Sequence, residues 1–304
     1  MKIKVLLCLA VILSLSFVSR VQAQTFEVFN RNSLVGQGGV LVIKIADQLR
    51  DKNLRLYAFD ELYSFNKNGF VFVGVGAEQK PGEYRVYLVE MGNEGKPIHY
   101  DFHYCRINVL EKEFGTPWYI GPVRKRTKAV QEQRMKEVAI LNDAFRSANI
   151  KEDYTTGNFI RPLENNEVTD SFGTLRLYGR YDKKTKKIKI EGRIPHGGVD
   201  LRAKTPLPVR AINSGTVLLT HYFPLGGTEG NLLIIDHGSG IISLYLHLSK
   251  FKVKKGEHVD KGQIVAMTGE TPSGTPPHLH LMVKINGVKV DPLAFIDTIN
   301  AVLY

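Results

Sequence analysis

The stretch GTPPHLHLMVKING (274–287) places two histidines, His278 and His280, one position apart in an apolar run. Side chains two positions apart on a strand project to the same face, so we expect the two imidazoles to point together while the leucine between them faces the core. The Asn-Gly pair at 286–287 predicts a tight hairpin turn. Two protonated imidazoles would repel each other, and a metal ion removes that conflict because it requires neutral nitrogen donors. By itself the pair is a weak indication of a metal site.

A second motif, PHGGVDL (195–201), supplies His196 and Asp200. Four residues of extended chain span about 13 Å, which is too far for shared ligation, but the two glycines between them permit a sharp bend. With such a bend, His196, Asp200 and one histidine of the pair would form a site with three protein ligands and an open fourth position, which is typical of catalytic zinc. The spacing leaves open which histidine of the pair binds the metal.

The remaining histidines receive separate interpretations. His247, in LYLHLS, lies on a strand-like segment and could join His278 beside a water that zinc acidifies. His237, in IDHGSG, is followed by glycines and is interpreted as a structural hydrogen-bonding residue at a hairpin. His221 and His258 are interpreted as surface residues.

Taken in order, HGGVD, LYLHLS and PPHLH, with TPLPVRAINSGTV (205–217) and VKKGEHVDKGQIVAMTG (253–269) between them, resemble the lysostaphin/LytM-type zinc endopeptidases, which cut peptidoglycan peptides. The resemblance covers residues 159–296 and implies a C-terminal antiparallel β metallopeptidase domain. There are two departures from the family pattern. Leu281-Met282 stands where the family often has Phe-Glu, and TPSGTPPHLH lacks the more usual Ser-Thr-Gly run.

The resemblance implies a role for each of five side chains. His196, Asp200 and His280 would bind Zn²⁺, one ion per chain. His247 and His278 would position and deprotonate the attacking water and stabilise the tetrahedral oxyanion. The glycine-rich segment before the last motif also resembles the hairpin of biotinyl/lipoyl carrier domains, but such a carrier would not need these five residues.

Residues 24–111 contain short β-branched or aromatic segments separated by Gly, Asn, Asp and Pro. This pattern predicts an immunoglobulin-like β-sandwich that serves for positioning or binding. Cys105 lies on one of these segments and has no partner once Cys8 is removed with the N-terminus. It is interpreted as a buried, inert thiol.

Residues 112–158 are expected to form a helical connector, because apolar residues recur at helical spacing within 126–148 and no Gly or Pro interrupts them. Residues 159–304 return to strands with many glycines. They include a hairpin with a basic tip at 176–194 and a last strand in VKVDPLAF (288–295). The fold class is therefore mainly β, with an N-terminal sandwich and a C-terminal domain of LytM type.

The first residues predict a signal peptide, 1–23, with Lys2 and Lys4 before an apolar run at 5–18 and the small-residue site VQA at 21–23. A retained membrane helix is the alternative, but the run is shorter than the roughly 20 residues that a bilayer requires. No later segment is apolar enough to span, so no stable transmembrane anchor is expected. We expect an exported protein, located in the periplasm or otherwise secreted or associated with the cell wall.

The chain has 41 Lys and Arg residues against 30 Asp and Glu, and loss of the signal peptide leaves a net charge of +8. For an exported protein this charge favours an anionic wall polymer over nucleic acid. The sequence therefore predicts a zinc endopeptidase that hydrolyses amide bonds in peptidoglycan stem peptides or cross-bridges, with a regulatory envelope protein as a further partner. The alternatives are a non-catalytic LytM-type regulator of another wall hydrolase, which would be marked by lost ligands, and a wall-binding protein whose main activity lies in residues 24–111.

Overall fold

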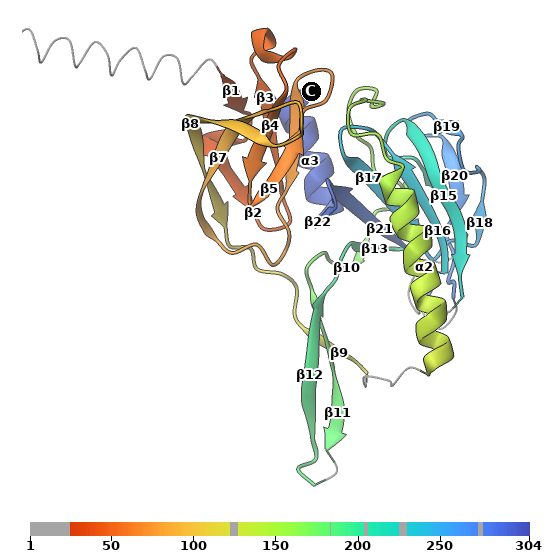
Figure 1. Cartoon of the computed structure of the whole chain (residues 1–304). Helices are drawn as coiled ribbons and strands as arrows, with labels where there is room; N and C mark the ends of the chain where they lie inside the picture. The colour runs from red at the N-terminus through yellow and green to blue at the C-terminus, as the bar shows by residue number, and fades with distance from the viewer. Residues whose placement is uncertain (1–24, 122–126, 183, 204–205, 225–229, 273–275) are drawn as a thin grey trace, which may run out of the picture.

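The computed structural model describes residues 25–121, 127–182, 184–203, 206–224, 230–272 and 276–304, without the side chains of 99–103 and 120. Within these residues the chain is mainly β, as the sequence predicts (Figure 1). The predicted signal peptide lies outside the described residues. No helix among the described residues is long and apolar enough to cross a membrane.

The N-terminal strands form two sheets with a common core. The first sheet has the order β1-β3-β6 and contains β1 (Phe26–Val28), β3 (Val40–Ile45) and β6 (Phe70–Gly74). The second has the order β2-β8-β7-β4-β5 and contains β2 (Leu34–Gly36), β8 (Pro97–Leu110), β7 (Gly82–Met91), β4 (Leu54–Ala58) and β5 (Glu61–Ser64). Single 3-10 turns are present at η1 (Arg31–Ser33) and η2 (Asp47–Leu49). The immunoglobulin-like assignment stays a prediction, and Cys105 is half-buried at the margin of the core instead of buried.

Strand β3 is buried on both faces over its first four residues, which explains why VLVI (40–43) is apolar without alternation. Leu41 and Ile43 pack into the core between the two N-terminal sheets. Val40 and Val42 belong to the hydrophobic core of the C-terminal strands. The first sheet therefore lies between two cores, and the N-terminal and C-terminal parts pack directly against each other.

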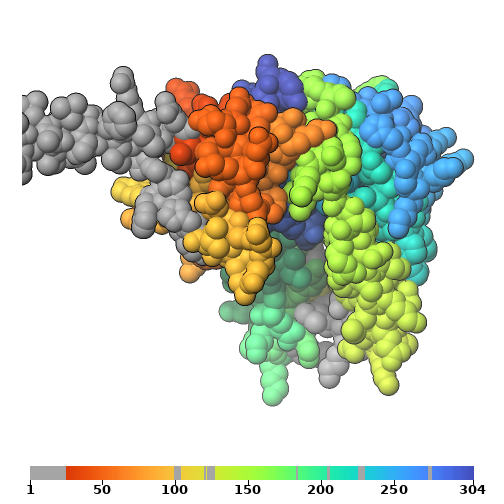
Figure 2. Space-filling model, turned by 45° about the horizontal axis from the view of Figure 1, so that its top comes forward, coloured from red at the N-terminus to blue at the C-terminus, as the bar shows by residue number. Residues whose placement is uncertain are grey.

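The connector contributes one strand and one helix, β9 (Trp118–Gly121) and α2 (Lys128–Arg146). The helix lies within the predicted range, and Thr127 caps its start by accepting a hydrogen bond from the Val130 N–H at 3.3 Å. Leu141 and Phe145 pack with buried residues of the C-terminal sheet, including Leu219. Figure 2 shows α2, in yellow-green, lying along the C-terminal strands. The apolar stripe of the helix thus packs on a sheet, as the sequence indicates.

The C-terminal part centres on an eight-stranded antiparallel sheet in the order β10-β13-β21-β17-β16-β15-β19, with β22 paired to β21. Its strands are β10 (Val168–Asp170), β13 (Val199–Arg202), β15 (Gly215–Phe223), β16 (Gly230–Asp236), β17 (Ile241–Leu246), β19 (His258–Val259), β21 (His278–Ile285) and β22 (Val288–Val290). A small sheet contains β14 (Pro208–Arg210), β20 (Ile264–Met267) and β18 (Lys250–Phe251). The predicted basic hairpin is β11 (Leu175–Asp182) and β12 (Lys187–Pro195), and it projects from the body with β9 beside β11 (Figure 1).

The hairpin turn predicted at Asn286-Gly287 is present between β21 and β22. Both residues have positive φ, 47° and 88°, as a two-residue turn of this kind requires.

The strand predicted in VKVDPLAF is wrong beyond Val290, because helix α3 (Pro292–Leu303) begins there. Asp291 caps this helix, its Oδ1 accepting from the Leu293 and Ala294 N–H groups at 3.0 and 3.2 Å. Pro292 at the first helical position is also favourable, since its fixed φ suits a helix and its missing N–H leaves no donor unpaired. The Asp-Pro pair outweighs the β-branched residues before it.

Candidate metal centre

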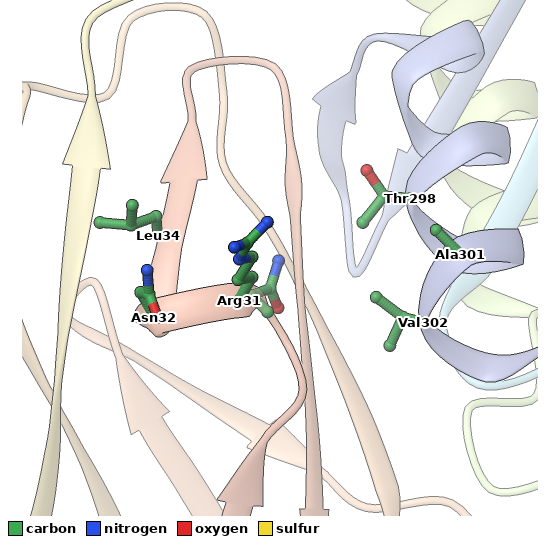
Figure 3. Close-up of a pocket in the computed structure, with 7 residues that line it drawn as sticks. Arg31, Asn32, Leu34, Thr298, Ala301 and Val302 are labelled. Carbon is green, nitrogen blue, oxygen red and sulfur yellow. The ribbon is translucent and has the colours of Figure 1, made fainter.

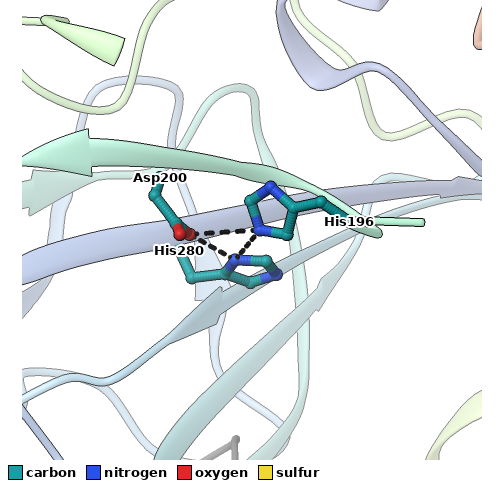
Figure 4. Close-up of side chains that lie close together, drawn as sticks. All are labelled: His196, Asp200 and His280. Atoms are coloured by element: carbon teal, nitrogen blue, oxygen red, sulfur yellow. Dashed lines mark hydrogen bonds and ion pairs between the residues drawn. The ribbon is translucent and has the colours of Figure 1, made fainter. Parts of the chain in front are cut away.

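His196, Asp200 and His280 converge at one point of the C-terminal sheet (Figure 4). The cross-strand register places Asp200 of β13 opposite His280 of β21, and His196 stands in the junction between β12 and β13. Asp200 Oδ1 lies 3.3 Å from His196 Nε2 and 2.6 Å from His280 Nδ1, and the two nitrogens are 3.0 Å apart. The bend expected between His196 and Asp200 is present at Gly198. The geometry thus brings together the three side chains that the resemblance implies as ligands.

Gly198 permits the close approach of this bend to β21. A Cβ at this position would lie 2.3 Å from Leu281 O and 2.9 Å from His280 Nε2. A Cβ on the neighbouring Gly197 would approach most closely the flexible end of Lys289, at 2.9 Å. Of these two glycines, only Gly198 would therefore bring a Cβ against the backbone of β21.

Hydrogen bonds to the main chain fix the orientation of His196, which is 2% exposed. Its Nδ1–H donates to Ser171 O at 3.0 Å, with Asp170 Oδ2 at 3.4 Å from the same nitrogen. The Nε2 lone pair is therefore left for the cluster. Asp170 and Ser171 were not predicted, because their contact with His196 depends on how β10 pairs with β13 and not on a local motif.

His247 and His278 lie beside this cluster, with ring centroids 4.7 Å apart. The Nδ1–H of His247 donates to Thr271 O at 2.7 Å, and the Nδ1–H of His278 donates to Pro276 O at 2.7 Å. Each ring keeps its Nε2 free of these bonds, and that of His278 is 3.9 Å from Asp200 Oδ1. His247 also has a φ of +63°, a conformation that is uncommon for a residue other than glycine and that is often found at functional sites.

The pKa values of Asp200 and of two neighbouring imidazoles, His280 and His247, are all lowered. Burial opposes ionisation of Asp200, but hydrogen bonds with His196 and His280 and the charges of those rings outweigh burial and hold the pKa of Asp200 well below its usual range. Burial lowers the pKa of His280. Burial, followed by the charges of His280 and His278, lowers the pKa of His247 to about 4. An ionised Asp200 and a neutral His280 are the protonation states that a divalent metal requires of these two groups.

The three ligand atoms fit one zinc ion. Metal–ligand bonds of about 2.0–2.1 Å in a tetrahedron keep the ligand atoms roughly 3.3 Å apart. The observed separations, 2.6 to 3.3 Å, are close to that value. Two imidazole nitrogens and one carboxylate oxygen are also a donor set used by catalytic zinc sites, which leave the fourth position open.

Arg176 of β11 contacts the other oxygen of Asp200, and the sequence did not identify it. Its Nη2 lies 3.1 Å from Asp200 Oδ2 and 2.7 Å from Asp170 Oδ2. An arginine on a strand of a projecting hairpin is ordinarily expected to face solvent. No local signal marks it, because Arg176 lies on β11 and the whole of β12 separates that strand from the ligand motif.

The other histidines of the C-terminal part differ from this cluster. His237 is fully buried, and its ring nitrogens contact Ser214 O and Ser243 Oγ, both at 2.8 Å, which confirms its structural interpretation. Burial lowers the pKa of His237 to about 4. His258 is exposed, as expected, whereas His221 is half-buried.

A hollow of about 490 Å³ lies away from the histidines, between η1 and α3 (Figure 3). Its lining residues are Asn30, Arg31, Asn32, Leu34, Thr298, Ala301 and Val302. None of them is His, Asp, Glu or Cys, so this hollow lacks the groups that metal binding or acid–base chemistry requires. The histidine cluster is the better candidate site because it has the chemistry.

Comparison with known proteins identifies the family of the C-terminal part. Residues 194–292 match Peptidase family M23. This range contains the three clustered residues and the two histidines beside them. The chain carries an M23 peptidase domain. The resemblance to lysostaphin/LytM-type enzymes that the motifs indicate is thereby confirmed.

Two curated relatives show the extent of the M23 similarity. The peptidoglycan DD-endopeptidase ShyA of Vibrio cholerae is 37% identical over 118 residues, which are 39% of this chain and 27% of ShyA. Lysostaphin of Staphylococcus staphylolyticus is 36% identical over 126 residues, which are 40% of this chain and 25% of lysostaphin. The chain thus spans about a quarter of the length of these relatives.

A solved structure extends the fold similarity beyond the M23 domain. A crystal structure of a Pseudomonas aeruginosa protein assigned to peptidase M23 matches with a TM-score of 0.59 and 23% identity. The match covers 86% of this chain and 94% of that one. The arrangement of the N-terminal sheets, connector and M23 domain therefore has a counterpart in a solved structure.

Proposed function

We propose that this protein is an exported, zinc-dependent endopeptidase that hydrolyses amide bonds in peptidoglycan stem peptides or cross-bridges. The observation that carries the proposal is the convergence of His196 Nε2, Asp200 Oδ1 and His280 Nδ1 within 3.3 Å, beside two further histidines. Similarity of the M23 domain to a peptidoglycan DD-endopeptidase and to lysostaphin supports the reaction class and the substrate. The net charge of the chain, +11 with its predicted signal peptide, supports attraction to an anionic wall.

In this proposal His196, Asp200 and His280 hold one Zn²⁺. Zinc bound there would lower the pKa of a water molecule and polarise the scissile carbonyl. His196 is oriented for this role by Ser171 O, and Asp200 presents Oδ1 because Arg176 occupies Oδ2. These main-chain and side-chain contacts hold the ligand atoms in place before any ion binds, so little reorganisation is needed.

His247 and His278 then serve proton transfer and charge stabilisation. Because each donates its Nδ1–H to a backbone carbonyl, each presents Nε2 for the reaction. A neutral Nε2 accepts a proton from the attacking water, and the same nitrogen, once protonated, donates to the developing oxyanion or to the leaving amine. The carbonyls of Thr271 and Pro276 prevent the rings from turning their Nδ1 toward the substrate.

The test is hydrolysis of purified peptidoglycan by residues 24–304, with mass spectrometry of the products. We expect zinc-dependent release of peptide fragments that His280→Ala abolishes. His247→Ala should still bind zinc but lose about 100-fold or more in rate, because a positioned general base contributes that much. His258→Ala, which alters an exposed histidine of the same domain, is the matched control and should cleave like the unchanged protein.

Failure of the folded, zinc-loaded protein to release fragments would contradict catalysis and favour the non-catalytic regulator. The alternative of a wall-binding protein whose main activity lies in residues 24–111 predicts that the C-terminal part neither binds zinc nor cleaves. The intact chain should be used for both arms, because Val40 and Val42 of the first sheet belong to the core of the C-terminal part. Removing the N-terminal sheets would expose that core.

A further inference from the structure

Arg176 connects the metal centre with the connector. Its Nη2 bridges Asp200 Oδ2 at 3.1 Å and Asp170 Oδ2 at 2.7 Å. Its guanidinium carbon lies 5.7 Å from the centre of the Trp118 ring, a cation–π arrangement. Trp118 belongs to β9, the connector strand, and stands opposite Arg176 in the parallel pairing of β9 with β11.

We propose that Arg176 is a positioning residue for Asp200 and that Trp118 holds Arg176 in place, so that the docked connector strand sets how tightly the site binds its metal. The inference rests on the proposed zinc site. It assigns to the connector a role in the reaction beyond joining the two parts of the chain.

The two oxygens of Asp200 contact different groups. Oδ1 faces His196 Nε2 and His280 Nδ1, whereas Oδ2 is taken by Arg176. An unrestrained carboxylate can rotate and exchange its oxygens. Arg176 stops that rotation, so Oδ1 alone is presented to the metal. Contacts of this kind to a ligand change metal affinity by about 10–100-fold when removed.

Arg176 has two opposing effects on metal binding, because it orients Asp200 and also brings a positive charge near the metal. A guanidinium beside a metal ligand also repels a cation, which would weaken binding. Asp170 offsets this, since its carboxylate lies closer to Nη2 than Asp200 does and its side chain is only 12% exposed. The charges of Arg176 and Asp170 nearly cancel, so we expect the orientation of Asp200 to affect metal binding more than the repulsion between Arg176 and the metal does.

Trp118 is held in place by the strand to which it belongs. β9 pairs with β11, and Tyr119 Oη donates to Gly179 O at 3.0 Å. Trp118 remains 47% exposed, so its ring contributes little to a core, and it lies against the Arg176 guanidinium. At an exposed site such a contact is worth a factor of about five or less.

The experiment measures zinc dissociation constants of residues 24–304 by competition with a chromophoric chelator. The variants are Arg176→Met, Trp118→Leu, the double variant and Arg180→Met. Arg180 is the matched control because it lies on the same strand but pairs with Glu191 at 3.2 Å in solvent. Visible spectra of the Co²⁺-loaded proteins report the ligand geometry, and melting temperatures of the zinc-free proteins report any general loss of stability.

We expect Arg176→Met to weaken zinc binding by about 10–100-fold and to change the Co²⁺ spectrum. Trp118→Leu should weaken binding by about fivefold or less, and it should have no effect when Arg176 is already replaced, since it acts through that residue. Arg180→Met should match the unchanged protein.

Unchanged or tighter zinc binding by Arg176→Met, with an unchanged Co²⁺ spectrum, would overturn the positioning role. A Trp118→Leu effect that persists in full without Arg176 would overturn the link to the connector strand. Failure of the unchanged protein to bind zinc is a separate outcome, which would remove the proposed function itself.

Discussion

Two buried histidines of the C-terminal part, His237 and His196, differ in what their ring nitrogens contact. His237 has both nitrogens on neutral partners, a backbone carbonyl and a serine hydroxyl. His196 has one nitrogen on a backbone carbonyl and turns the other toward Asp200 and His280. Both His237 and His196 are at most 2% exposed. Burial therefore does not separate a structural histidine from a candidate metal ligand, whereas a ring nitrogen that faces a carboxylate does.

The largest expected effect comes from removing the carboxylate of Asp200, which His196 contacts and His237 does not. Asp200→Asn keeps the shape of the side chain but loses its charge, and zinc affinity should fall by more than 100-fold, since loss of a ligand exceeds the 10–100-fold effect of losing an outer contact. Competition with a chromophoric chelator measures it. His237→Gln is the control and should bind zinc normally. Equal loss of zinc affinity in Asp200→Asn and His237→Gln would contradict the distinction between the site at Asp200 and His237.

A backbone change at the bend sharpens the comparison further. Gly198→Ala places a Cβ 2.3 Å from Leu281 O, so β13 or β21 must shift. We expect a loss of about 1–3 kcal/mol in the free energy of unfolding, together with weaker zinc binding. Gly197→Ala meets mainly the flexible end of Lys289 and should cost less than about 1 kcal/mol. Denaturant unfolding of both zinc-free variants measures the difference, and equal losses would contradict the account of the bend.

The smallest expected effect is a pH dependence that belongs to His237. Burial lowers its pKa to about 4 in the folded chain, whereas an unfolded histidine titrates near 6.5. Between these values the unfolded state binds more protons, so the free energy of unfolding falls as the pH falls through this window. From pH 7 to 5.5 the unchanged protein should lose about 1 kcal/mol more than His237→Gln. Denaturant unfolding at both pH values measures the difference, and parallel losses would argue against a buried neutral His237.

Local patterns predicted much of the site. The period of two along a strand placed His278 and His280 on one face, and two glycines indicated the bend that brings His196 to Asp200. Contacts that depend on long-range pairing were not predictable in the same way. Arg176, near the start of β11 at the base of the hairpin, reaches Asp200 only once β10 pairs with β13 and β11 with β12, and no local motif encodes that geometry.

The fold shows the same division between local and long-range information. The mainly β class and the connector helix follow from periodicity and composition. Helix α3 was missed although Asp291-Pro292 is a typical helix start, because the β-branched residues before it suggested a continuing strand. The double burial of β3 could be recognised only once both cores were known, since an apolar run alone does not tell which partners cover its two faces.

In the proposed function His196, Asp200 and His280 form a metal site, whereas His237 does not. The most direct measurement is the zinc content of purified residues 24–304 by elemental analysis, beside His280→Ala and His237→Gln. We expect one zinc per chain in the unchanged protein and in His237→Gln, and none in His280→Ala. Zinc retained at one per chain in His280→Ala, or absent from the unchanged, zinc-supplied protein, would contradict this expectation.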